Sequence, residues 1–202
     1  MTLLLKNLEN IVKETMSELN GTAHSYRHVN RVFKIATFLA KREKADVELV
    51  QIGALLHDVG WAVGKPHNET GAKLAAKILK EMGYPSEKSE KIVGIILRHP
   101  LAFKGKLETL EEKIVWDADK IDLLGVIGVV RAFHWLSNKP FEAVVKICLD
   151  EQTTIYDSLN TQTAKKIAKR RHREMMAFLS ALKRELSATD LAIGWCKRPF
   201  YT

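Results

Sequence analysis

The segment Ala54-Leu55-Leu56-His57-Asp58-Val59-Gly60 ends an apolar helical turn with two adjacent polar side chains. A carboxylate in apolar surroundings carries a desolvation cost unless it is paired or bound to a metal. The rest of the chain must therefore supply partners for Asp58. Two other stretches, residues 24–32 and 116–122, carry histidine, aspartate and arginine side chains on apolar helical patterns. The sequence thus predicts a fold that brings three distant segments together.

The composition is that of one ordinary globular domain. The chain has 202 residues, 46% of them hydrophobic and 28% charged, which is enough for one domain with a core and needs no second. Its two cysteines, Cys148 and Cys196, do not make a disulfide framework, which favours a reducing compartment. The apolar start is too short for a signal peptide, and no apolar run approaches the roughly 18 residues of a membrane span. We expect a single cytoplasmic domain, residues 1–202, without a membrane segment.

The net charge of +8 favours anionic partners in a general way. Six basic residues cluster within residues 165–173, where they form either a nucleic-acid patch or the solvated face of a helix. No aromatic side chains for base stacking are interleaved with them, so the solvated face is favoured over nucleic acid.

Apolar residues recur at helical spacing along most of the chain, and no segment reads as a strand. The pattern predicts an all-α, single-domain helical bundle with a core of residues 22–187, an N-terminal helix within 1–20 and a packed tail at 188–202. Asp46 is expected to cap the helix that ends at His57, and Gly60 to follow it in a left-handed turn. The N-terminal helix and the tail near Trp195 either form a homo-oligomer interface or close the core. The predicted helices span residues 3–19, 24–44, 46–58, 70–82, 85–98, 108–132, 140–159 and 161–186.

Four of the polar residues form a metal-ligand set in chain order: His28, His57, Asp58 and Asp119. Two imidazoles with two carboxylates suit manganese, iron, cobalt, nickel or zinc better than magnesium, which prefers oxygen alone. Four protein ligands on a six-coordinate ion leave positions for water and a substrate oxygen. Such a metal lowers the pKa of its bound water and polarises a phosphoryl oxygen.

This ordered pattern resembles the HD superfamily of metal-dependent phosphohydrolases, whose signature is H…HD…D. The resemblance maps the family's metal ligands onto His28, His57, Asp58 and Asp119 and implies an all-helical HD-type domain. The segments 117–131 and 161–179 are similar to a group of small, stand-alone HD hydrolases of the HDIG type, so the likeness covers roughly residues 22–187.

Some members of the superfamily hold a second metal with two further histidines. His67 and His99 stand between the His-Asp pair and the last aspartate, where such ligands are expected. The spacing from His67 to Gly71 resembles the dimetal HD-GYP subgroup, but Trp61 replaces that subgroup's lysine and its Gly-Tyr-Pro motif is absent. Both histidines are therefore expected either to bind a second ion or phosphate, or to lie exposed at loop ends.

Several further residues are candidates for catalysis and substrate binding. Asp122 and Glu69 each share a local face with a predicted ligand, which makes them candidate general acids. Asp122 is equally suited to a helix salt bridge or to orienting a ligating histidine. Basic side chains that could neutralise phosphate charge are Lys120, Arg131, Arg31 and Arg27. The histidines not expected to be ligands are His24, His134 and His172.

We therefore predict a metal-dependent phosphohydrolase in which metal-bound hydroxide cleaves a phosphate ester, with a nucleotide or related small phosphate as its partner. One or two divalent transition metals are the expected cofactor, and monoester and diester substrates both stay open. One alternative is a di-iron oxygenase of the same superfamily, which would require His67 and His99 as ligands. Another is a non-catalytic regulatory module that binds a metal or a nucleotide.

Overall fold

The computed structural model describes residues 2–192, and all the regular structure in that range is helical. The predicted all-α fold is therefore confirmed. None of the helices in these residues is both long and apolar enough to cross a membrane. The helices of the described range are α1 (Leu3–Thr15), α2 (Tyr26–Glu43), α3 (Val47–Leu56), α4 (His67–Glu81), α5 (Ser86–Arg98), α6 (Leu110–Ile121), α7 (Gly125–Trp135), α8 (Phe141–Asp150) and α9 (Gln162–Leu186), with shorter 3₁₀ turns at Ser17–Leu19, Val59–Ala62, Leu101–Phe103, Gln152–Ser158 and Thr189–Ala192.

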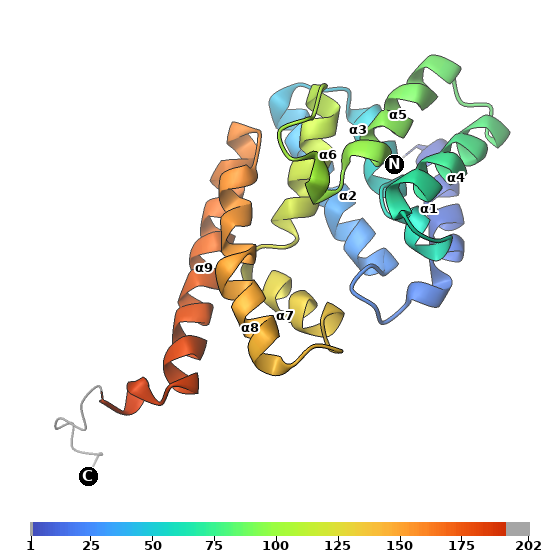
Figure 1. Ribbon diagram of the computed structural model, residues 1–202. Coiled ribbons are helices and arrows are strands. Elements are labelled where there is room, and N and C mark those ends of the chain that lie inside the picture. Colours follow the sequence, from blue (N-terminus) through green and yellow to red (C-terminus); the bar gives the residue numbers. More distant parts are fainter. Residues whose placement is uncertain (1, 193–202) are drawn as a thin grey trace, which may run out of the picture.

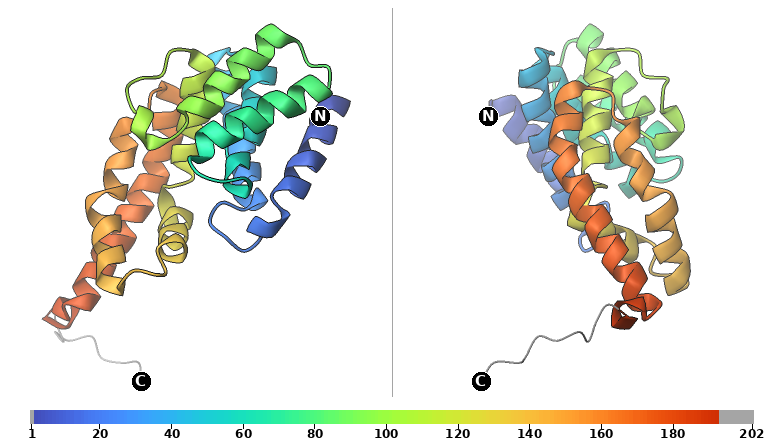
Figure 2. Two further views of the ribbon diagram at one scale, coloured as in Figure 1. Left: turned by 45° about the vertical axis from the view of Figure 1, so that its right-hand side comes forward. Right: turned by 90° about the vertical axis from the view of Figure 1, so that its left-hand side faces the viewer.

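The helices α2, α3 and α6 form the middle of the molecule, because α2 packs against both α3 and α6 (Figure 1). The helices α1, α4 and α5 lie on one side, and α7, α8 and α9 lie on the other (Figure 2). Each side has its own apolar core. One core surrounds Leu8, Leu55 and Ile92, and the other surrounds Leu39 and Trp116, all of them 2% exposed or less. The polar segments of α2, α3 and α6 meet between these two cores.

Most predicted helix ends agree with the structure to within a few residues. Asp46 caps α3, since its carboxylate accepts hydrogen bonds from the backbone N–H groups of Glu48 at 3.0 Å and Leu49 at 3.1 Å. Thr161 caps α9 by accepting from the N–H of Ala164. The predicted tail begins with a 3₁₀ turn at Thr189–Ala192, and its remainder, including Trp195, lies outside the described residues.

The predicted continuous helix over residues 108–132 is wrong. The chain leaves helical geometry after Ile121 and re-enters it at Gly125, whose φ of +78° is the left-handed conformation that favours glycine. A Cβ at this glycine would lie 3.2 Å from the Cβ of Arg171, so α9 packs directly against the break. The break separates α6 from α7, which can then return toward the end of α6. The predicted helix over 140–159 likewise divides into α8 and a 3₁₀ turn.

The expected left-handed turn at Gly60 is also wrong. Gly60 lies within the 3₁₀ turn Val59–Ala62 and is not among the glycines with positive φ. Its lack of a side chain serves a close approach instead, because a Cβ there would lie 1.8 Å from the carbonyl oxygen of His67 and 2.6 Å from the N of Gly71. The glycine thus allows the first turn of α4 to pack against the turn that follows Asp58.

Candidate metal centre and active site

The His-Asp pair lies at the C-terminal end of α3, where His57 is the C-cap residue. The Nδ1 atom of His57 lies 2.8 Å from the carbonyl oxygen of Ala54 in the last turn. A carbonyl only accepts, so Nδ1 carries the proton and the Nε2 lone pair points into the site. His57 is fully buried and Asp58 is 3% exposed. The local helix end therefore fixes both the orientation and the tautomer of this predicted ligand.

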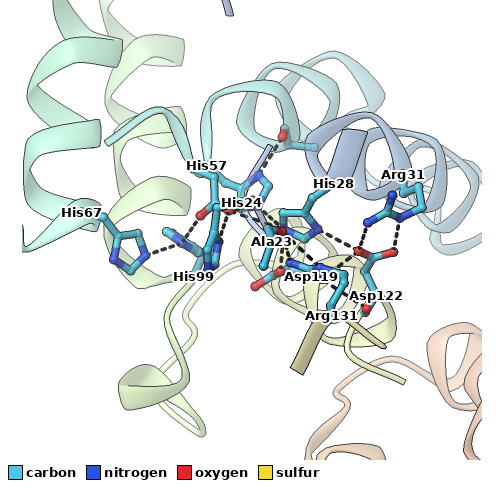
Figure 3. A network of polar contacts seen from close by, with 12 residues as sticks. Ala23, His24, His28, Arg31, His57, His67, His99, Asp119, Asp122 and Arg131 are labelled. Carbon is cyan, nitrogen blue, oxygen red and sulfur yellow. Dashed lines mark hydrogen bonds and ion pairs between the residues drawn. The ribbon is translucent and has the colours of Figure 1, made fainter. Parts of the chain in front are cut away.

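His28 reaches the same point from the first turn of α2 (Figure 3). Its Nε2 atom lies 3.3 Å from Nε2 of His57, 3.3 Å from Oδ1 of Asp119 and 3.4 Å from Oδ2 of Asp58. Its other ring nitrogen, Nδ1, lies 2.8 Å from Oδ2 of Asp122. The structure thus brings together the side chains of all four residues in the H…HD…D pattern, which come from α2, the C-terminal end of α3 and α6.

His67, at the start of α4, and His99, just after α5, lie at the end of the cluster away from Arg31 and Asp122 (Figure 3). Their Nε2 atoms are 3.1 Å apart, and Nε2 of His99 lies 3.4 Å from Oδ1 of Asp58. Nδ1 of His99 donates to the carbonyl oxygen of Ile96 at 2.6 Å, which again leaves Nε2 free to accept. His99 is buried rather than exposed at a loop end. The two oxygens of Asp58 therefore face two separate groups of histidines.

The donor atoms fit bound cations. The Nε2 lone pairs of His57 and His99 point at other histidine nitrogens, and a cation between such lone pairs replaces repulsion with coordination. Burial lowers the pKa of both His57 and His67 to about 4, so both rings are neutral near pH 7. Three overlapping sets have donor atoms within 4.8 Å of one another: His28, His57 and Asp119; Asp58, His67 and His99; and His24, His28 and Asp58.

Without a metal, a proton on His28 supplies part of the positive charge that the carboxylates of the cluster require. Burial lowers the pKa of His28, but hydrogen bonds to the carboxylates of Asp119, Asp122 and Asp58 outweigh it and raise the pKa to about 10. The pKa of Asp58 lies well below its usual value, because the surrounding histidines outweigh the effect of burial. The cluster therefore holds negative charge that only a cation or a proton can balance.

Asp122 connects the cluster to two arginines. It is fully buried, and its carboxylate accepts from Nε of Arg31 at 2.7 Å, from Nη2 of Arg31 at 2.9 Å and from Nη1 of Arg131 at 2.8 Å, in addition to His28. These donors, with burial as the opposing effect, lower the pKa of Asp122. It does not line the cavity described below, so the geometry favours its orienting role over its predicted role as general acid. Arg31 and Arg131, predicted to bind substrate, are both engaged with Asp122.

Of the other predicted site residues, one lies at the metal centre and two lie away from it. Lys120 is buried and lies at the cluster, where Nζ donates to Asp119 and to the carbonyl oxygen of His99 at 3.0 Å. Glu69 is exposed on the first turn of α4 and does not line the cavity, so the structure does not bring this candidate acid to the site. Arg27 is exposed and lines a different cleft.

Sequence reasoning missed the contribution of His24 and Trp61. Nδ1 of His24 lies 3.0 Å from Oδ2 of Asp58, although this histidine was not expected at the metal centre. The indole of Trp61 stacks against His24 at 4.4 Å and against His67 at 4.3 Å between ring centroids. His24 lies in the turn just before α2, four residues ahead of His28, and this closeness in sequence to a predicted ligand is the signal that could have placed it near the site.

The remaining two histidines lie elsewhere. His134 is exposed on α7 and lines the same cleft as Arg27. His172 on α9 stacks against Tyr156, with 4.8 Å between ring centroids. Neither belongs to the three sets of metal donors in the described chain.

The cluster forms one end of a cavity of about 670 Å³, a size suited to a small organic ligand. His24, Asp58, His67, His99 and Asp119 line the polar end. The rest of the wall is mostly apolar and aromatic, and its side chains come from the α6–α7 break, α7, α8 and the turn after α8. This part includes Leu123, Trp135, Leu136, Ile147 and Ile155, while exposed Lys104 lines the cavity from the segment after α5.

Comparison with known proteins agrees with this geometry. Residues 25–124 match the model of the HD domain, and all six predicted metal ligands lie in that range. The chain belongs to the HD superfamily of hydrolases.

Individual relatives match over most of their length. YpgQ of Bacillus subtilis is 28% identical over 205 residues, covering 92% of this chain and 97% of YpgQ. A protein of Methanocaldococcus jannaschii is 33% identical over 158 residues, covering 69% of this chain and 89% of the relative. Among solved structures, an HD-superfamily hydrolase from Bacillus thuringiensis superimposes with a TM-score of 0.74 at 27% identity, over 91% of this chain and 97% of that one.

Proposed function

We propose that this HD-superfamily chain is a metal-dependent phosphohydrolase that cleaves a phosphate ester of a nucleotide or a related small phosphate. The observation that carries the proposal is the convergence of five histidines and two aspartates at the end of a 670 Å³ cavity. YpgQ, which has the same fold, has been crystallised in complex with ADP, which supports a nucleotide as the ligand class.

Two groups of side chains would hold the metal. His28, His57 and Asp119 fit one divalent transition metal, such as manganese, iron, cobalt, nickel or zinc, and Asp58 lies within reach of the same ion. Asp58 with His67 and His99 fits a second ion, so that one carboxylate would serve both. A bound metal of this kind lowers the pKa of a water molecule and polarises a phosphoryl oxygen.

The other residues of the cavity bind and orient the substrate. Lys120 contributes a buried positive charge beside Asp119, where it stabilises the negative charge of a phosphate group. Trp61 and Trp135 are 5.3 Å apart between ring centroids and both line the cavity, so they offer flat apolar surfaces to a base or another planar group. The apolar wall beyond them excludes water from the remainder of the ligand.

Activity of matched histidine variants tests the proposal. The wild type with added manganese is assayed on nucleoside mono-, di- and triphosphates and on a cyclic dinucleotide. His57→Ala removes a ligand at the centre of the cluster, and we expect a loss of at least about 100-fold, the upper range for residues that only support a metal ligand. His172→Ala, which removes a histidine from α9 outside the metal-donor sets, serves as the control and should retain activity. Equal activity of folded His57→Ala and wild-type protein would refute the assignment.

A di-iron oxygenase remains the second candidate, because the Asp58–His67–His99 group fits a second ion. It requires two iron ions per chain and oxygen-dependent turnover. Full hydrolytic activity with manganese in the absence of oxygen would exclude it as the main activity.

A further inference from the structure

A second cleft lies behind the metal centre, on the other side of Arg131. It has a volume of about 770 Å³ and is formed by the loop before α2, the first turns of α2 and the outer face of α7. Ala23 and Arg131 line both this cleft and the metal-site cavity, so they form a shared wall. Figure 3 shows Arg31 and Arg131 beside Asp122 in the polar network.

Basic side chains line the cleft, and two of its arginines also pair with the buried carboxylate of Asp122. Arg27, Arg31, Arg131 and His134 line it, and none of the described residues that line it is acidic. Arg27 is exposed, and Arg31 uses Nε and Nη2 for Asp122 while its side chain remains 34% exposed. Arg27 and Arg31 are four residues apart on α2, so their guanidinium groups share one face of the helix. Paired guanidinium groups match the geometry and charge of phosphate oxygens.

Uncapped hydrogen-bond donors face the same cleft. Ser25 is the N-cap of the 18-residue helix α2, yet its hydroxyl does not cap the helix. Ser25 is 7% exposed and lines the cleft, and its hydroxyl makes no hydrogen bond to another described residue. The first N–H groups of a helix and its positive dipole end favour an anion at this position. The Ser25 hydroxyl has no hydrogen-bond partner among the described residues, so it can add a further donor for such a ligand.

We propose that this cleft is a second ligand site, distinct from the metal centre, that binds the phosphate groups of a small phosphorylated molecule. Ser25, Arg27 and Arg31 hold the phosphate oxygens, and the two neighbouring guanidinium groups favour a multiply charged group such as a diphosphate over a single carboxylate. Ile127 and Val130, 37% and 57% exposed, offer apolar contact to the rest of the molecule. The ligand and Asp122 share the guanidinium group of Arg31, so the second site lies next to Asp122, the carboxylate that holds His28.

Calorimetric titration with inorganic pyrophosphate tests the site on the full-length, metal-loaded protein. Arg27→Glu reverses the charge at an exposed position in the first turn of α2, where an acidic residue favours the helix, so the variant should fold. Lys41→Glu makes the same charge change on the same helix, away from the cleft, and serves as the control. We expect wild type and Lys41→Glu to bind pyrophosphate in the cleft, and Arg27→Glu to bind there at least tenfold more weakly.

The His57→Ala variant separates the two sites. Pyrophosphate binding that survives in His57→Ala and is lost when Arg27→Glu is added belongs to the cleft. Equal affinity of the Arg27→Glu and Lys41→Glu proteins in that background overturns the proposal, as does the absence of any pyrophosphate binding by His57→Ala. Neither result changes the hydrolysis assay, so failure of the cleft and failure of the catalytic assignment are distinguishable.

Discussion

Replacing Asp122 by asparagine separates the two roles that this residue could have. Asp122 touches no part of the cavity but accepts hydrogen bonds from His28, Arg31 and Arg131. Asparagine keeps the shape and removes the charge, and its NH₂ group adds a donor where every neighbour already donates. We therefore expect Asp122→Asn to disturb His28, and through it the metal, without removing any group that contacts substrate.

The magnitude follows from these contacts. Removing one partner of a buried charge network costs about 3–5 kcal/mol of stability, because the remaining charges stay buried without compensation. Loss of a residue that orients a metal ligand lowers metal affinity by about 10–100-fold, which corresponds to about 1.4–2.7 kcal/mol. Excess metal should therefore restore much of the activity of the variant.

The assay measures metal affinity by competition with a chelator, and activity as a function of metal concentration. Asp117→Asn is the matched control, since Asp117 is also a fully buried carboxylate on α6 but accepts 2.8 Å hydrogen bonds from Asn160 and Thr161 instead. We expect the control to lose stability with unchanged metal affinity. An Asp122→Asn protein with wild-type metal affinity whose activity is lost at saturating metal would refute the orienting role and favour a general acid.

Three further predictions concern protons and packing. The pKa of His28 is about 10 without metal, so metal binding near pH 8 should release about one proton from this histidine. The metal affinity should therefore rise by about tenfold per pH unit. Calorimetric titrations in buffers of different ionisation enthalpy measure the released proton, and the absence of proton release would contradict this prediction. Gly60→Ala should displace the start of α4, because the new Cβ would overlap the carbonyl of His67. The variant should therefore have a lower melting temperature and a lower occupancy of the second metal. An unchanged metal occupancy would contradict this prediction. Burial raises the pKa of Glu112, but its ion pair with Arg98 outweighs this and lowers it, so the pair stabilises the fold above pH 4.5 and this contribution is lost as pH falls. The stability difference between wild type and Glu112→Gln should therefore shrink in acid, as urea unfolding at several pH values would measure, and a constant difference would refute the pairing.

The sequence located most of the helices and pointed to six residues whose side chains the structure places close together. Apolar periodicity marks which face of each helix is buried, and cap residues such as Asp46 and Thr161 mark where helices begin. The order of the histidines and aspartates along the chain then indicates a shared site, because each interrupts an apolar face that must be buried.

Features that depend on contacts between distant segments could not be read in this way. The break after α6 depends on α9 packing against Gly125, and periodicity continues through it unchanged. Asp119 and Asp122 share a face by spacing, yet the contacts of Asp122 with Arg31 on α2 and Arg131 on α7, which hold it against His28, depend on tertiary packing. Local patterns show which side chains are buried, whereas tertiary packing decides which of them meet.

Metal content per chain tests the central claim most directly. Protein purified without added metal is analysed by elemental mass spectrometry, together with an Asp58→Asn variant that alters the carboxylate facing both histidine groups. We expect one or two equivalents of a transition metal in the wild type and a clear reduction in the variant. Wild-type protein that contains no metal, and takes up none when manganese is added, would contradict the proposed metal centre.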